Sequence, residues 1–247
     1  MKNMKQHEAV IKTMEENGGY ATLGFLNQNV FKIKDCKWNT KTPFASIRRI
    51  VQDERFFFNI KPGLWALNSH RNKIPIEILP TKETSIKEQE FFNHSYYQGL
   101  LVEIGNLKKF DTFVPNQDKN KKFLGKPLGE ISSIDDFYNF GYERIVDRAK
   151  TVDVSWFNIR KMPDSLFEVE HCTNFINSFT KFVELQDFNL KFFIVANKVK
   201  KSEYESKLSQ NAFLSIKNRI QSMDYDKLSE WHTKTYELNI VENNFWF

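Results

Sequence analysis

The segment SLFEVEHC, residues 165–172, constrains the fold more than any other part of the chain. In an extended strand, side chains two residues apart lie on the same face of the sheet. Phe167 and Val169 then face a core. Glu168 and Glu170 stand side by side on the opposite face. Two carboxylates this close on a half-buried surface raise the free energy of the folded state unless a positive charge lies near them. The segment therefore predicts a strand that presents two acids to a cation.

A third acid lies on the strand predicted just before this one. The sequence TVDVSWF, residues 151–157, has the Val, Val and Trp pattern of a strand and contains Asp153, with fourteen residues between Asp153 and Glu168. Mg²⁺ prefers oxygen ligands, and one or two carboxylates usually suffice beside water and a substrate phosphate. The three acids therefore indicate a site for Mg²⁺, with Mn²⁺ as the alternative. The other interpretation is a solvated strand face.

The basic charge of the chain is concentrated near its beginning. Residues 1–66 contain eleven Lys and Arg against six Asp and Glu, which accounts for the whole formal net charge of +5. Residues 67–247 are balanced. This distribution indicates a small module that binds a polyanion, attached to a neutral body. Ordinary solubilising surface charge is the alternative explanation.

Cysteine usage and apolar segments indicate the cellular compartment. The chain has two cysteines, Cys36 and Cys172, without Cys-x-x-Cys spacing, which argues against a disulfide scaffold or a Cys-rich zinc site. The segment MKNMKQHEAVIKTMEEN lacks the apolar core of a signal peptide, and no apolar run approaches membrane-spanning length. We therefore expect a protein of the prokaryotic cytoplasm with no membrane partner.

The first 68 residues read as three short helices and a hairpin. The expected elements are helices over 5–17 and 23–34, a third helix within 40–54, a short strand at 20–22, and a hairpin within 55–67. Thr42 is a good N-cap for the third helix, and Pro43 suits its first position. This order predicts a winged helix.

The rest of the chain alternates helices and strands. Residues 69–87 mix Pro, charged, Ser and Thr side chains and read as a linker. We then expect a helix over 88–107, a strand at 110–116, an exposed loop at 117–130, a helix near 135–149, the two acid-bearing strands, a helix over 173–188, a buried strand at 190–197 and mainly helix over 201–235.

The N-terminal pattern resembles the HARE-type helix-turn-helix, a winged-helix family. The likeness covers residues 4–67 and is carried by HEAVIKTMEENGG, TKTPFASIRRIVQDERFFF and KPGLWAL. It implies DNA binding; a protein–protein module with this fold is the alternative. Because such helices enter the major groove, the candidate base or phosphate contacts are Lys41, Thr42, Ser46, Arg48, Arg49 and Gln52. Lys61, at the hairpin tip, is expected to touch a backbone phosphate.

The acid-bearing strands resemble the PD-(D/E)XK nuclease motif. The longer stretch DVSWF…FEVEHCTNFINSF is also similar to prokaryotic nucleases with an EVEH signature, over residues 90–200. The resemblance implies that Asp153, Glu168 and the Val169 carbonyl hold the metal. The pattern departs at Glu170, where the superfamily has Lys. Glu170 is expected to orient or deprotonate the attacking water, or to help hold a second metal.

Three supporting residues follow from the same resemblance. His94 and Gln98 lie at i and i+4 on one helix face, and HSYYQ matches the His–x–x–x–Gln spacing of the similar group. An ordinary, partly buried polar pair is the other interpretation. Lys181 lies where that group has a basic residue and is expected to contact phosphate. His171 is interpreted as structural.

These observations predict an α+β protein: a winged helix (1–68), a linker (69–87) and a restriction-endonuclease-like mixed sheet flanked by helices (88–247). We expect a type II-like endodeoxyribonuclease of a restriction system that cuts double-stranded DNA and leaves 5′-phosphates. A modification-dependent nuclease and a catalytically inactive DNA-binding protein remain alternatives. Cutting both strands requires a homodimer or sequential nicking, and a cognate DNA methyltransferase is expected as a separate chain.

Overall fold

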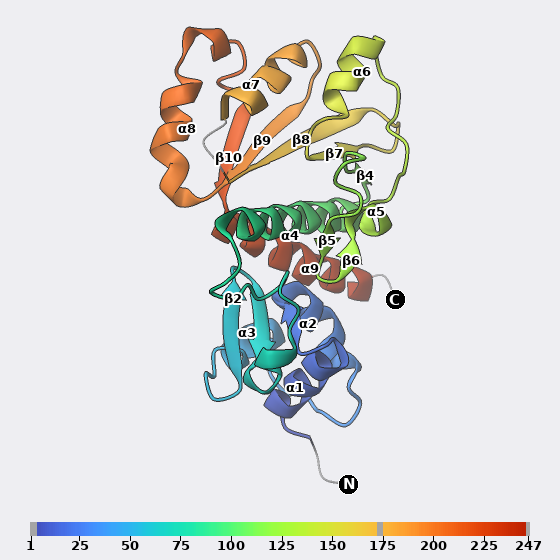
Figure 1. Cartoon of the computed structure of the whole chain (residues 1–247). Helices are drawn as coiled ribbons and strands as arrows, with labels where there is room; N and C mark the ends of the chain where they lie inside the picture. Colours follow the sequence, from blue (N-terminus) through green and yellow to red (C-terminus); the bar gives the residue numbers. More distant parts are fainter. Residues whose placement is uncertain (1–3, 172–174, 246–247) are drawn as a thin grey trace. The chain divides into compact units, whose positions relative to one another are not determined.

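The chain divides into two units in the computed structural model, which describes residues 4–171 and 175–245 (Figure 1). The first unit contains Met1–Thr84 together with Ser229–Phe247, and the second contains Ser85–Leu228. The last residues of the chain are thus grouped with the N-terminal unit, whereas the division made from the sequence keeps 88–247 together.

The first unit has the order of helices and strands predicted from the sequence. Its elements are α1 (Gln6–Glu16), β1 (Tyr20–Thr22), α2 (Leu23–Asn29), a 3₁₀ turn (Val30–Lys32), α3 (Pro43–Ile50), β2 (Phe57–Lys61) and β3 (Leu64–Leu67). The three strands form an antiparallel sheet in the order β1-β3-β2. The second helix is shorter than expected, because its last turn tightens into the 3₁₀ conformation.

Local chemistry explains where these helices begin and end. Gly18 and Gly19 follow α1 with φ of 81° and 91°, a conformation that glycine adopts without steric cost. The Thr22 side chain caps α2 by accepting a hydrogen bond from the Phe25 backbone N–H at 3.1 Å. Thr42 occupies the expected N-cap position of α3, although its side chain makes no capping hydrogen bond. The core of this unit includes Ala9, Val10, Met14, Leu26, Ile47, Val51, Phe57 and Leu67.

The segment predicted as a linker belongs to the first unit. A 3₁₀ helix, Asn68–Lys73, follows β3 directly, and turns continue to Thr84. Ser85 then opens the second unit as the N-cap of α4 (Ile86–Leu107). Its hydroxyl accepts from the Glu88 N–H at 3.3 Å, and the Glu88 carboxylate accepts from the Ser85 N–H at 2.9 Å. This capping box fixes where the long helix starts.

A five-stranded mixed sheet forms the centre of the second unit, in the order β10-β9-β8-β7-β4 (Figure 1). Its strands are β4 (Asp111–Phe113), β7 (Val154–Phe157), β8 (Pro163–Glu170), β9 (Lys191–Ala196) and β10 (Ile220–Asp224). The pairs β4–β7 and β7–β8 are antiparallel, and β8, β9 and β10 run parallel. The predicted α+β class is confirmed.

Helices cover the sheet and bury its apolar side chains. One core joins Leu166, Phe192 and Ile194 of the sheet to α6 (Glu143–Ala149), α7 (Phe175–Glu184) and α8 (Lys201–Leu208). Helix α4 packs against β4, β7 and β8. Helix α9 (Tyr225–Phe245) begins at the end of this unit and continues into residues grouped with the first. No helix in the described ranges has the length and apolar character needed to cross a bilayer.

Two expectations for this unit are wrong, and a third is incomplete. Residues 117–130 are not simply an exposed loop: they contain β5 (Lys122–Phe123), β6 (Lys126–Pro127) and the start of α5 (Leu128–Ile131). Phe123 is buried against α4 at Gly99, where a Cβ atom would lie 2.1 Å from its ring. The helix expected near 135–149 is limited to α6. The region over 201–235 is mainly helical as expected, with α8, a 3₁₀ helix (Asn211–Phe213) and the start of α9, but it also contains the edge strand β10, whose exposed polar residues give no strand pattern.

Candidate active site

The two acid-bearing strands lie next to each other in the sheet. Val154 of β7 pairs with Phe167 of β8, so Asp153, which precedes β7, lies beside Glu168. The Val169 backbone N–H donates a hydrogen bond to Asp153 Oδ2 at 2.8 Å. This bond ties the first acid to the strand that carries the other two. The structure therefore brings together Asp153, Glu168 and Val169, the three residues expected to hold the metal.

The positive charge beside Glu168 is an ammonium group. Lys181, on the buried side of α7, places its Nζ atom 2.8 and 3.0 Å from the two carboxylate oxygens of Glu168. The same Nζ donates to the Thr151 carbonyl at 2.8 Å. Only 8 % of Lys181 and 3 % of Glu168 is exposed. The sequence predicts a metal ion at the glutamates, whereas Glu168 already has the Lys181 ammonium as its partner.

Ser178 connects the two glutamates. Its hydroxyl donates to Glu168 Oε2 at 3.0 Å and also contacts Glu170 Oε1 at hydrogen-bond distance. A hydroxyl has one proton to donate, so the second contact is satisfied when one carboxyl group carries a proton. Burial, with repulsion from Asp153, raises the pKa of Glu168 to about 8 despite Lys181. Burial also raises the pKa of Glu170. The pair therefore favours retaining a proton.

Asp153 is held as an anion chiefly by His94 of α4. Its Oδ2 atom lies 3.1 Å from His94 Nε2. Burial opposes ionisation of Asp153, but the charge and hydrogen bond of His94 outweigh it and lower the pKa of Asp153. Burial likewise opposes protonation of His94, and the attraction to Asp153 outweighs it and raises the pKa of His94. The two groups stabilise each other's charged form.

Gln98 fixes the backbone next to Asp153. Its side-chain Nε2 donates to the Asp153 carbonyl at 3.0 Å and to Asp118 Oδ2 at 2.7 Å. Gln98 is fully buried and Asp118 is 3 % exposed. Lys121 lies 2.7 Å from the other Asp118 oxygen. His94 and Gln98 thus both meet Asp153 from one helix face, and neither contacts the glutamates directly.

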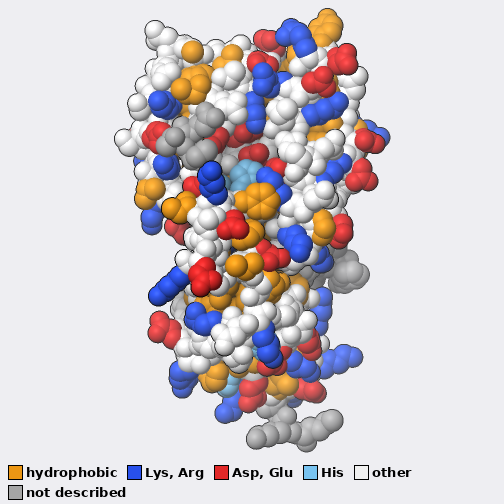
Figure 2. All heavy atoms as spheres, in the orientation of Figure 1, with side chains coloured by type: hydrophobic (Ala, Val, Ile, Leu, Met, Phe, Trp, Pro, Cys, Tyr) orange, Lys and Arg blue, Asp and Glu red, His pale blue; other side chains and the backbone are white. Residues whose placement is uncertain are grey.

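His171 follows the acid pair at the end of β8. Its Nδ1 atom lies 2.7 Å from the Tyr225 hydroxyl, which also donates to the Glu170 carbonyl at 3.2 Å. The Tyr225 ring stacks on Tyr97 with centroids 3.9 Å apart. These contacts fit the structural role expected for His171. In the space-filling view, a histidine surface lies in a hollow of the second unit among acidic and basic side chains (Figure 2).

The donor atoms suit a hard divalent cation. Among the described residues, no group of three His, Cys, Asp or Glu side chains forms a complete metal site. Asp153 and Glu168 nevertheless supply two adjacent carboxylates, and Mg²⁺ or Mn²⁺ completes its shell with water and phosphate. Both hydrogen bonds to the Asp153 carboxylate from described residues go to Oδ2. The other oxygen, Oδ1, can therefore face a cation.

Three DNA-contact candidates of the first unit, Ser46, Arg48 and Arg49, lie on α3, and Lys41, Thr42 and Gln52 flank this helix. Thr42, Ser46 and Arg49 line a cavity of about 260 Å³ together with Gln6, Ala45 and Ile50. Lys41 and Gln52 are exposed. Helical periodicity does not distinguish Arg48 from Arg49 as the DNA contact. In the structure their surroundings differ: Arg48 Nη2 lies 2.9 Å from Glu237 Oε1 of α9, whereas Arg49 lines the cavity.

Lys61 is less accessible than a phosphate contact at a hairpin tip requires. It ends β2 and is half-buried, and burial lowers its pKa to about 8. The neighbouring Gly63 approaches Ser229 so closely that a Cβ atom would lie 2.0 Å from the serine hydroxyl. The hairpin tip is therefore packed inside the first unit. Cys36 is a free, buried thiol, and Cys172 lies outside the described residues.

Two side chains of this site were missed in the sequence. Ser178 lies three residues before Lys181, so the two polar groups share one face of α7 among its buried phenylalanines. That pattern was visible and could have identified Ser178. Asp118 lies in the segment read as an exposed loop, and no local pattern connects it with Gln98.

Comparison with known proteins agrees with these observations. No curated protein and no solved structure matches the chain. A family model described as the type II restriction enzyme NmeDI C-terminal domain matches residues 74–246. The match includes both acid-bearing strands, α4 and α7. The chain therefore belongs to the family of the type II restriction enzyme NmeDI C-terminal domain.

Proposed function

We propose that the protein is a Mg²⁺-dependent type II restriction endonuclease that hydrolyses phosphodiester bonds of double-stranded DNA and leaves 5′-phosphates. Membership of a restriction-enzyme family supports DNA as the substrate and cleavage as the reaction. The observation that carries the proposal is the meeting of Asp153 and Glu168 on paired strands with Lys181 bound to Glu168. This constellation supports the assignment of a PD-(D/E)XK-type site.

The acids are assigned to cation binding. Asp153, Glu168 and the Val169 carbonyl would hold Mg²⁺, which stabilises charge that develops on the phosphate and lowers the pKa of a bound water. His94 keeps Asp153 ionised, and Gln98 holds its backbone in place. The ionised state of Asp153 suits a ligand that must be deprotonated before it binds a cation.

Lys181 supports the proposal by supplying the charge that is missing at position 170. The superfamily pattern has Lys two residues after the second acid, and this chain has Glu170 there. The Lys181 ammonium reaches Glu168 from α7 instead. A cation in this position can stabilise a phosphate oxygen of the substrate. Lys181 is therefore assigned to the substrate phosphate.

Glu170 is assigned to the attacking water. A general base works best when its pKa lies close to the working pH. Burial raises the pKa of Glu170 above that of a free glutamate, so it accepts a proton more readily near neutral pH. Ser178, in contact with Glu170 Oε1, orients the carboxyl group.

The first unit is assigned to DNA binding as a winged helix. Its order of helices and strands and the exposed polar face of α3 support this role. Lys41, Thr42, Ser46, Arg49 and Gln52 are the proposed contacts. Arg48 and Lys61 are assigned to packing within the unit, because Arg48 forms an ion pair with Glu237 and Lys61 is half-buried. The acting species is proposed to be a homodimer, with a separate methyltransferase protecting host DNA.

Plasmid cleavage tests the proposal. Wild-type protein is incubated with plasmid and Mg²⁺, beside Glu168→Ala and the matched control Glu184→Ala, which changes an exposed glutamate on α7. We expect cleavage by wild type and control, none with EDTA, and DNA retardation without cleavage for Glu168→Ala. Equal cutting by Glu168→Ala would refute the site. Methylated and unmethylated plasmids distinguish a plain restriction enzyme from a modification-dependent one.

A further inference from the structure

A lysine-rich cavity lies at the carboxyl ends of β9 and β10. Its volume is about 280 Å³, and four lysines line it: Lys198, Lys200, Lys201 and Lys227. The polar side chains of Asn197 and Ser222 also face it. In sheets with parallel strands, ligands bind at the carboxyl ends of the strands, where the connecting segments leave a crevice. The cavity is therefore in the usual place for a ligand.

The cavity shares a sheet edge with the candidate active site. Glu170 of β8 pairs with Ala196 of β9, and Ala196 pairs with Asp224 of β10. Adjacent strands lie about 4.8 Å apart, so the cavity begins roughly one strand away from the glutamates. Both Ala196 and Asp224 line it. A polymer bound at the acids can therefore continue into the cavity.

The lysines of this wall are weakly neutralised by protein acids. Lys198, Lys200 and Lys201 lie 3.8, 3.7 and 3.8 Å from their nearest acids, longer than the 2.8 Å of Lys181 and Glu168. Lys227 has no ion pair within the described part of the chain. The one acid in the wall, Asp224, accepts a hydrogen bond from the Lys227 backbone N–H at 2.8 Å. The residues that line the cavity, four lysines and one aspartate, are therefore net positive and suit an anion.

We propose that this cavity binds a backbone phosphate of the DNA strand that is cut, next to the phosphate at the acids. The proposal rests on the function proposed above and adds a second phosphate position to the same site. Lysine binds phosphate as a point charge without reading the base. The cavity therefore contributes affinity and alignment of the strand, and no sequence selectivity.

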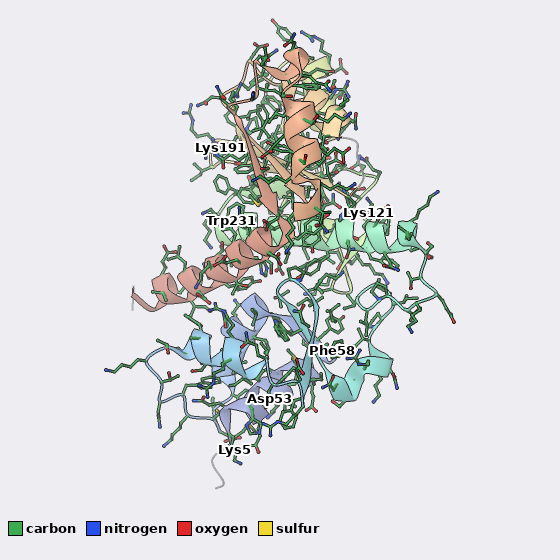
Figure 3. The ribbon with its side chains drawn as sticks, turned by 90° about the vertical axis from the view of Figure 1, so that its left-hand side faces the viewer. Lys5, Asp53, Phe58, Lys121, Lys191 and Trp231 are labelled. Atoms are coloured by element: carbon green, nitrogen blue, oxygen red, sulfur yellow. The ribbon has the colours of Figure 1, made fainter. Side chains whose placement is uncertain are left out.

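The test measures how DNA binding depends on salt in the Glu168→Ala background, which requires no cleavage. The cavity variant is Lys200→Gln/Lys227→Gln, which removes one charge from the 3₁₀ helix Lys198–Lys200 and one from α9. The control is Lys191→Gln/Lys217→Gln, which removes the same charge at the amino ends of β9 and β10; Lys191 is labelled in Figure 3. Loss of one phosphate contact lowers the slope of log affinity against log salt by about one.

We expect that loss of slope for the cavity variant, with affinity reduced about tenfold, and no change for the control. Lys200→Arg/Lys227→Arg should restore both. Circular dichroism melting checks folding, and the single Lys227→Gln variant, at an exposed position, replaces the double variant if that one unfolds. Equal slopes for cavity variant and control would overturn the proposal.

Two further outcomes separate this proposal from others. Calorimetric titration with ATP and with inorganic phosphate asks whether the cavity binds a free phosphate compound; tight ATP binding with an unchanged DNA slope would overturn the proposal. Wild-type protein that binds DNA with the expected slope but never cuts plasmid would remove the nuclease function and leave the phosphate site standing. Plasmid cleavage by the wild type, with equal salt slopes for the cavity variant and the control, would support the nuclease function and overturn the phosphate site.

Discussion

Two basic side chains for which the sequence predicts DNA contact are each paired with a glutamate, in very different surroundings. The side chains of Lys181 and Glu168 are 10 % and 4 % exposed, whereas those of Arg48 and Glu237 are 41 % and 12 % exposed. Removing one partner of a buried pair costs about 3–5 kcal/mol, and an exposed pair contributes about 0.2–1 kcal/mol. The same kind of contact therefore fixes the position of a buried acid in one unit and adjusts packing in the other.

The partners around each pair reinforce this difference. Lys181 is held by both oxygens of Glu168 and by the Thr151 carbonyl. Glu237, in contrast, keeps Lys234 at 2.7 Å when Arg48 is removed. Because these three hydrogen bonds use all the N–H groups of the buried ammonium, they fix the position of the Lys181 side chain. Arg48, whose side chain is 41 % exposed and which shares Glu237 with Lys234, can be lost with little rearrangement.

The largest expected effect is that of Lys181→Met. We expect the free energy of unfolding to fall by roughly 3 kcal/mol, the low end for a broken buried pair, because Glu168 can take up a proton. Plasmid cleavage should fall at least about 100-fold, as expected for loss of a charge that stabilises the transition state. Chemical denaturation and cleavage assays measure the two effects, with Lys150→Met as an exposed control.

The double variant Lys181→Met/Glu168→Gln sharpens this test. It removes both charges, so most of the lost stability should return while cleavage stays absent. If Lys181→Met is no less stable than the Lys150→Met control, the contrast between the two ion pairs is wrong.

An intermediate effect concerns pH. Because the pKa of Glu168 is raised to about 8, the folded protein binds more protons than the unfolded chain between about pH 4.5 and 8. Its metal-free stability should therefore be highest at the acidic end of this range and fall as pH rises toward 8. Thermal unfolding in EDTA at several pH values measures this, and Glu168→Gln should lose most of the trend. A wild-type trend identical to that of Glu168→Gln would contradict the raised pKa.

The smallest effects belong to α3. Arg49→Ala should lower the salt slope of DNA binding by about one, with the stability of the protein unchanged. Arg48→Ala should instead lower the free energy of unfolding by about 0.2–1 kcal/mol and leave the slope unchanged, because its guanidinium is engaged by Glu237. Fluorescence anisotropy and denaturant titration measure the two. A lower salt slope for Arg48→Ala, with no change for Arg49→Ala, would mean that Arg48 and not Arg49 contacts the DNA.

Local signals made much of the fold predictable. Glycines after α1, Pro43 at the start of α3 and the Lys61-Pro62-Gly63 turn mark the elements of the first unit. Asp153 and Glu168 could be placed on neighbouring strands because their segments carry clear strand patterns. Lys181 was found through resemblance, but its partner was not, since spacing alone does not say which acid a helix reaches.

The features that were missed depend on distant parts of the chain. Strand β10 is held by pairing with β9 and has only one buried end, so its own residues do not reveal it. Asp118 is defined by Gln98, which lies twenty residues earlier in the chain. The ion pair of Arg48 joins residues separated by 189 positions. None of these contacts leaves a periodic trace in the sequence.

The hairpin formed by β5 and β6 limits which surface segments can be shortened without disturbing the site. It is a surface excursion, yet Phe123 is seated on Gly99 of α4, one residue after Gln98. The nearby Asp118 accepts a hydrogen bond from the Gln98 side chain. Shortening this hairpin would weaken the support behind Asp153 without changing Asp153, Glu168 or Glu170. Relatives that trim their surface here would therefore have to rebuild that support from another part of the chain.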